Sequence, residues 1–223
     1  MNYQPQSVVR TRESELATNK VLRNTYILLS MTLLFSAVTA GISMAIAVPP
    51  FMSLVSSLGA LALIWLVLPR VAHSSAGIWV VFAMTGLLGF GLGPVLNMYA
   101  AIPNGAQIIS TALGGTGLIF LGLSAYALTT RKNFSFMGGF LMVGFLVVLL
   151  AAIANIFLAI PALSLTISAV VILIMSGFIL YDTSRIIHGG ETNYILATVG
   201  LYLGIYNIFI SLLHILGAVS GND

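Results

Sequence analysis

The sequence predicts an all-α integral membrane protein with seven transmembrane helices, and three observations support this fold class. Of the 223 residues, 59% are hydrophobic and only 6% are charged, whereas soluble domains carry about 25% charged residues. Apolar segments of about twenty residues recur along the chain, which is the length that a helix needs to cross a bilayer. The Lys and Arg residues all fall in alternate connections between those segments.

Seven apolar segments follow a polar start, so we expect two parts. The first part is a flexible cytoplasmic tail over residues 1–19, which has little apolar surface to bury. The second is a seven-helix transmembrane domain over residues 20–223. Prolines, glycines and basic residues separate the segments and are typical helix stops. The predicted spans are 21–47, 51–68, 77–100, 106–128, 136–158, 163–188 and 194–219.

The positions of the basic residues predict the orientation of the chain. Lys and Arg concentrate in the cytoplasmic loops of membrane proteins. The N-terminal segment through Arg23 and the second–third, fourth–fifth and sixth–seventh connections hold all eight of them, namely Arg10, Arg12, Lys20, Arg23, Arg70, Arg131, Lys132 and Arg185. We therefore expect a cytoplasmic N-terminus and a periplasmic C-terminus. Scattered over separate connections, these residues form no basic patch, so we expect no nucleic-acid partner.

The last span carries a stripe of small and polar residues. Gly200, Gly204, Asn207, Ser211 and His214 recur at steps of three or four, which places them along one helical face. A helix surrounded by lipid would gain nothing from such a face, whereas a helix among other helices can pack closely along it. We therefore predict that the last helix is central and interpret the stripe as packing, with a pore lining as the alternative.

Asp182 is the only acidic residue within a hydrophobic segment, and such residues are candidates for function. One interpretation pairs its carboxylate with Arg185, one turn away, or with another cytoplasmic cation. The other interpretation makes Asp182 an ion ligand or gate near the cytoplasmic side of a pore. It is also the one candidate metal ligand, although calcium takes six to eight oxygen ligands.

Other residues in the spans are candidates for helix packing. Gly89, Gly93 and Pro94 allow either a close helix contact or a kink. Asn97 and Asn155 lie near the outer ends of their spans, where they can hydrogen-bond between helices. We expect Gly200 to allow close approach in the same way.

No catalytic constellation is visible in the sequence. The chain has no cysteine, and His73, His188 and His214 lie in separate segments. An intramembrane protease needs two aspartates or a serine–histidine pair, and the sequence ties no serine to a base. We therefore expect a protein that is not an enzyme and needs no cofactor.

Several segments together closely resemble the Bax inhibitor-1 family, and within it the bacterial YccA-like branch. The resemblance extends over nearly the whole chain from residue 20 onward. It rests on KVLRNTY (20–26), LGPVLN (92–97), ALGGT (112–116), LTTRK (128–132), ANIFL (154–158) and IHGGETNY (187–194).

The resemblance implies a seven-helix bundle with a central last helix, in the bacterial inner membrane, and two functional themes. Proteins of the YccA-like branch are substrates and modulators of the membrane-anchored AAA protease FtsH. Other members are pH-sensitive calcium leak channels with an aspartate pair between the sixth and seventh helices. Asp182 matches the first aspartate, but Gly204 stands where the second would be. Two neighbouring carboxylates share protons and so form a pH switch, and this chain lacks that coupling.

Two function hypotheses follow. In the first, the protein binds and modulates FtsH, and acts as a slow competing substrate. Its tail could reach roughly 65 Å when fully extended, at about 3.3–3.6 Å per residue. The alternative is a cation leak for calcium or protons through the bundle, with Asp182 near its cytoplasmic gate. Since we can name only one carboxylate, we place the leak second. The expected partners are thus FtsH and the lipid bilayer, with calcium or protons under the alternative.

Overall fold

The computed structural model describes residues 6–220, and every regular element in that range is helical. Seven helical spans there are long and apolar enough to cross a membrane, which confirms the predicted fold class. In chain order the segments are α1 (Gln6–Ala45), α2 (Phe51–Ala62), η1 (Leu63–Val67), α3 (Leu68–Val71), α4 (Ala76–Ala100), α5 (Gly105–Thr130), α6 (Met137–Leu158), α7 (Pro161–Ile187) and α8 (Tyr194–Ser220).

The helix α1 starts well before its apolar part. It begins at Gln6, while the candidate membrane span begins at Leu16. No glycine or proline occurs between Gln6 and Lys20, so nothing in this segment breaks a helix. Most of the expected tail is therefore helical and continuous with the first span, and residues 1–5 of it lie outside the described residues.

The second span consists of α2, η1 and α3 because Pro69 interrupts its hydrogen bonding. A proline within a helix has no N–H to donate, and its ring clashes with the carbonyl four residues earlier. That earlier residue is Trp65, which lies in the π-helical segment η1. A π turn is a common response to such a conflict. In contrast, α4 continues through Pro94 as one helix.

The turn after α7 is a glycine C-cap, as the Gly189–Gly190 pair predicts. Gly189 has a φ of 71°, in the left-handed region. The Gly190 amide donates to the Arg185 carbonyl at 2.8 Å, and the Gly189 amide donates to Ile186 at 3.2 Å. These two bonds define a Schellman motif, which satisfies carbonyls that the helix end would otherwise leave free.

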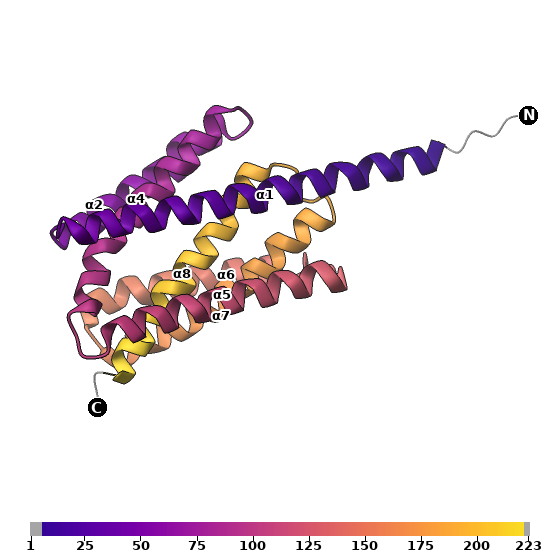
Figure 1. Cartoon of the computed structure of the whole chain (residues 1–223). Helices are drawn as coiled ribbons and strands as arrows, with labels where there is room; N and C mark the ends of the chain where they lie inside the picture. Colours follow the sequence, from indigo (N-terminus) through magenta and orange to yellow (C-terminus); the bar gives the residue numbers. More distant parts are fainter. Residues whose placement is uncertain (1–5, 221–223) are drawn as a thin grey trace, which may run out of the picture.

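The last helix is central, as predicted. α8 packs against α1, α4, α5 and α7, and Figure 1 shows it between the pair α1–α4 and the group α5–α7. It has the largest buried share of the seven spans, 56%, whereas α6 has the smallest, 11%. Among the described elements, α6 packs only against α7. The polar face of α8 is therefore enclosed by other helices.

The glycines of α4 provide a second site of close packing, against α1. A Cβ atom at Gly89 would collide with the Ser36 carbonyl oxygen and the Thr39 hydroxyl, and one at Gly93 would collide with Ser43. At the end of this interface, the Asn97 amide donates to the Met44 carbonyl at 3.1 Å. These contacts agree with the packing roles expected for Gly89 and Gly93 and with the bonding between helices expected for Asn97, which stay predictions.

One end of the bundle gathers the segments that carry the basic residues. The Asn193 amide at the start of α8 donates to the Ala72 carbonyl after α3, at 2.8 Å. The Ser184 hydroxyl near the end of α7 donates to the Lys132 carbonyl after α5, at 3.2 Å. The arrangement agrees with the segregation of Lys and Arg along the sequence. A cytoplasmic location for this end stays a prediction.

We predict that Gly89→Ala lowers the thermal midpoint of the protein in detergent. The added Cβ meets the backbone of α1, and overpacking costs about 1–3 kcal/mol. Gly117→Ala on α5 is the matched control, because a Cβ there meets nothing within 4 Å. The control should unfold at or above the wild-type temperature, since alanine favours a helix more than glycine does. Equal midpoints for the two variants would contradict the close packing of α1 and α4.

Candidate functional site

The candidate site lies between α7 and α8 and contains the carboxylate of Asp182. A Cβ atom built on Gly200 would lie 2.6 Å from Asp182 Oδ2, so the carboxylate rests directly against the backbone of α8. Asp182 is partly buried, and no hydrogen bond or ion pair joins its side chain to another described residue. Gly200 therefore makes room for an acidic side chain, which is a more specific role than the helix packing expected for it.

Arg185 forms its ion pair with Glu191 and not with Asp182, so the interpretation that pairs Asp182 with Arg185 finds no support in the structure. The Arg185 guanidinium lies 3.5 Å from the Glu191 carboxylate and donates to the Gly190 carbonyl at 3.0 Å. It also lies 5.6 Å from the centre of the Tyr181 ring. Arg185 is in the last turn of α7, where free carbonyls and the negative end of the helix dipole attract a cation. The guanidinium therefore turns toward the connection and away from the membrane interior.

The stripe on α8 mainly contacts α7. Gly200 lies against Asp182, and a Cβ on Gly204 would lie 3.2 Å from Ile179. His214 Nδ1 is 2.8 Å from the Ser168 hydroxyl. The Asn207 amide donates to the Leu203 carbonyl of its own helix at 2.8 Å. These contacts are those of a packing face.

Ser211, the remaining member of the stripe, is 6% exposed. The position where the resemblance implies a second aspartate, Gly204, points at Ile179, which lies one turn before Asp182. Glycine at this position lets α7 and α8 approach, and it leaves Asp182 as a single carboxylate. Within the part of the chain that the structure describes, no three His, Cys, Asp or Glu side chains come together to hold a metal ion.

The structure pairs a serine with a histidine, which the sequence could not do. A hydroxyl bonded to an imidazole is the minimal arrangement of a nucleophile and a base. However, Ser168 is only 7% exposed, and its hydroxyl faces α8. We interpret the Ser168–His214 bond as a link between these two helices. Asn155 makes a comparable link, since its amide donates to the Ser164 hydroxyl at 2.6 Å.

Sequence reasoning missed Tyr202, which connects three helices. Its hydroxyl is 2.7 Å from the Ser36 hydroxyl of α1 and donates to the Thr85 carbonyl of α4 at 3.4 Å. Tyr202 is 1% exposed, and its ring stacks on Tyr206. A tyrosine within an apolar run that has no place in the polar stripe was the available signal, because a buried tyrosine usually finds a partner for its hydroxyl.

We predict that Tyr202→Phe lowers the stability of the protein by about 1–3 kcal/mol, because it leaves the buried Ser36 hydroxyl without its partner. The measurement is thermal or chemical unfolding of the purified protein in detergent micelles. Tyr126→Phe provides the control, since Tyr126 is 44% exposed on the outer surface of α5. A loss of stability that is the same in both variants would contradict a special role for Tyr202.

Comparison with known proteins identifies the family. Residues 18–221 match the model of the family described as Inhibitor of apoptosis-promoting Bax1. A protein of Escherichia coli K12 named Modulator of FtsH protease YccA is 56% identical over 209 residues, which cover 94% of each chain. An uncharacterized membrane protein of Vibrio cholerae is 53% identical over 211 residues, which cover 95% of each chain.

A further relative, from E. coli O6:H1, is named Inner membrane protein YccA and is also 56% identical over 209 residues. Together with the seven apolar helices, these relatives confirm the expected location in the bacterial inner membrane. The family resemblance read from the quoted sequence segments is likewise confirmed. This chain is a multi-pass inner-membrane protein that belongs to the Bax inhibitor-1 family and is closely related to the YccA proteins of E. coli.

Proposed function

We propose that this protein modulates FtsH and does so by binding it as a slow, competing substrate, without enzymatic activity of its own. The observation that supports the proposal most is the 56% identity to the E. coli protein named as a modulator of that protease. The identity covers 94% of both chains, so most of the bundle is part of the comparison.

The shape of α1 supports a role for the N-terminal segment in this binding. About ten helical residues precede the membrane span, which corresponds to about 15 Å at 1.5 Å per residue. Figure 1 shows this part of α1 extending beyond the other helices. An isolated helix this short is marginally stable in water. A protease ring could therefore unwind the segment and gain the longer reach of an extended chain.

The packing of the bundle supports slow degradation once the segment is engaged. α1 packs against α4, α7 and α8, and its Ser36 bonds to the fully buried Tyr202. Glycines of α4 fit directly against its backbone. Withdrawing α1 breaks all of these contacts together. A substrate that is gripped readily but extracted slowly occupies the protease and so restrains the degradation of other proteins.

We predict that deleting residues 2–15 lengthens the half-life of the protein in cells with active FtsH and abolishes its co-purification with FtsH in mild detergent. Pulse-chase labelling and a pull-down measure the two effects. In cells without active FtsH, the full-length and truncated proteins should turn over equally. Unchanged turnover and unchanged co-purification of the truncated protein would contradict the proposal.

A second candidate function, the cation leak, is favoured by one observation. Asp182 lies within a membrane span and has no bonding partner among the described residues, so its carboxylate is available to an ion. Against the leak, Gly204 removes the second carboxylate, and the α8 stripe packs against α7. The FtsH proposal therefore stays first.

If the protein is a leak, Asp182→Asn will change the flux of calcium or protons into liposomes that contain the purified protein. A dye enclosed in the vesicles reports this flux. Glu191→Gln is the matched control, since Glu191 lies in the connection after α7 and pairs with Arg185. Equal flux in empty vesicles and in vesicles with the wild-type protein would exclude the leak.

A further inference from the structure

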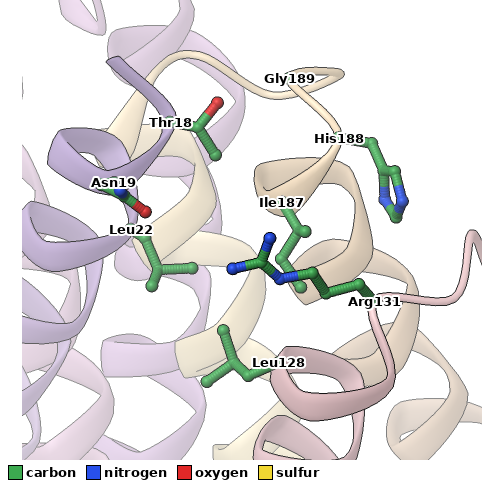
Figure 2. Close-up of a pocket in the computed structure, with 8 residues that line it drawn as sticks. All are labelled: Thr18, Asn19, Leu22, Leu128, Arg131, Ile187, His188 and Gly189. Atoms are coloured by element: carbon green, nitrogen blue, oxygen red, sulfur yellow. The ribbon is translucent and has the colours of Figure 1, made fainter. Parts of the chain in front are cut away.

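A pocket of about 340 Å³ opens at the end of the bundle that carries the basic residues. It lies where the membrane part of α1 begins and where α5 and α7 end. Figure 2 shows its walls. The residues that line it are Thr18, Asn19, Leu22, Leu128, Arg131, Ile187, His188 and Gly189.

Arg131 is the only Arg or Lys among the residues that line the pocket. Figure 2 shows its guanidinium extending across the pocket toward α1, between Leu22 and Ile187. Arg131 takes the left-handed conformation, with a φ of 48°, at the end of α5, and its amide donates to the Ala127 carbonyl. This backbone turn directs the side chain back over the bundle. No hydrogen bond or ion pair joins the guanidinium to any side chain in residues 16–220.

The walls of the pocket divide into a polar and an apolar part. Thr18 and Asn19 lie on the side nearer to the end of the bundle, and Leu22, Leu128 and Ile187 lie deeper. α1 and α5 both line the pocket; their backbones stay apart, and one turn deeper the rings of Tyr26 and Phe120 join them, with centroids 6.1 Å apart. His188 Nδ1 lies 2.9 Å from the Ser184 carbonyl oxygen.

Three residues with hydroxyl groups, one from each helix that lines the pocket, follow or precede the apolar lining residues by one helical turn. Tyr26, Ser124 and Thr183 are four residues from Leu22, Leu128 and Ile187 respectively, on the same helix faces. Their hydroxyls are buried and have no hydrogen-bond partner in the described part of the chain. These hydroxyls lie outside the pocket, whose deeper lining is apolar.

We propose that this pocket binds the headgroup of an anionic phospholipid, with the phosphodiester on Arg131. A guanidinium forms two parallel hydrogen bonds to phosphate oxygens, and basic pockets between transmembrane helices on the cytoplasmic side bind anionic headgroups. Asn19 lines the pocket on the α1 side, and its amide can donate to the same headgroup. The bound lipid holds together the start of α1 and the ends of α5 and α7.

Native mass spectrometry of the protein, purified in mild detergent with added phosphatidylglycerol, tests this site. Arg131→Ala should weaken lipid binding by about tenfold, because it removes a charge-assisted pair of hydrogen bonds. Lys132→Ala is the matched control: it removes the same charge from the next position, which does not line the pocket, and should retain the lipid. Asn19→Trp should also abolish binding, because it fills the pocket at an exposed position without changing the charge.

A thermal-shift series with one concentration of each compound distinguishes the sources of the phosphate group. Short-chain phosphatidylglycerol should raise the thermal midpoint of the wild type and not that of Arg131→Ala, since a ligand that binds the folded state stabilises it. Equal stabilisation by phosphatidylcholine or by inorganic phosphate would overturn the assignment to an anionic lipid. Equal losses of binding in Arg131→Ala and Lys132→Ala would overturn the assignment to this pocket.

Discussion

The close approach of α8 to its neighbours is the constraint on which the rest of the structure depends. Within hydrocarbon, a polar group without a partner costs several kcal/mol, so the helices must satisfy one another. Gly200 and Gly204 bring the backbone of α8 against α7, and on another face Tyr202 bonds to α1 and α4. The single helix α8 thereby positions the Asp182 carboxylate, the hydrogen bonds of the Tyr202 hydroxyl and the centre of the apolar core.

Polar contacts then join the bundle at three levels. At the end with the basic residues, Asn193 and Ser184 bond to the connections beside them. Ser36 and Tyr202 bond near the middle of the bundle, and at the opposite end Asn97 bonds to Met44. Small residues bring the helices close enough for these bonds. Packing and polar pairing therefore depend on the same positions, which is typical of helices that associate without a hydrophobic driving force.

The sequence predicted those features that depend on local composition. Spans follow from apolar length, the α7 cap follows from Gly189–Gly190, and the central helix follows from its stripe. Contacts between distant segments could not be predicted in this way. Arg185 has several partners within reach, and only the geometry of the α7 end selects Glu191 over Asp182. Tyr202 looked like any apolar position because its partners come from two other helices.

The pocket around Arg131 illustrates the same limit, since its walls come from three segments that are far apart in the sequence. The basic residue suggested only an orientation in the membrane. The direction of the Arg131 side chain depends on the left-handed backbone conformation at the end of α5. Residues other than glycine rarely adopt this conformation, so the sequence did not predict it for an arginine. The aspartate–glycine contact between α7 and α8 was also beyond what spacing could predict, and the family resemblance drew attention to Gly204 instead of Gly200.

The position of the Ser36–Tyr202 bond on the first helix has a mechanical consequence. A force applied to the N-terminus acts first on α1, and this helix runs along α4 and α8 over much of its membrane length. The force therefore acts first on the contacts of α1 with α4 and α8, and it shears them along the helix axis. A force applied to a helix with one neighbour, such as α6, would meet far less resistance. The protein therefore resists unfolding best when it is pulled from the N-terminal end of α1, which extends beyond the bundle.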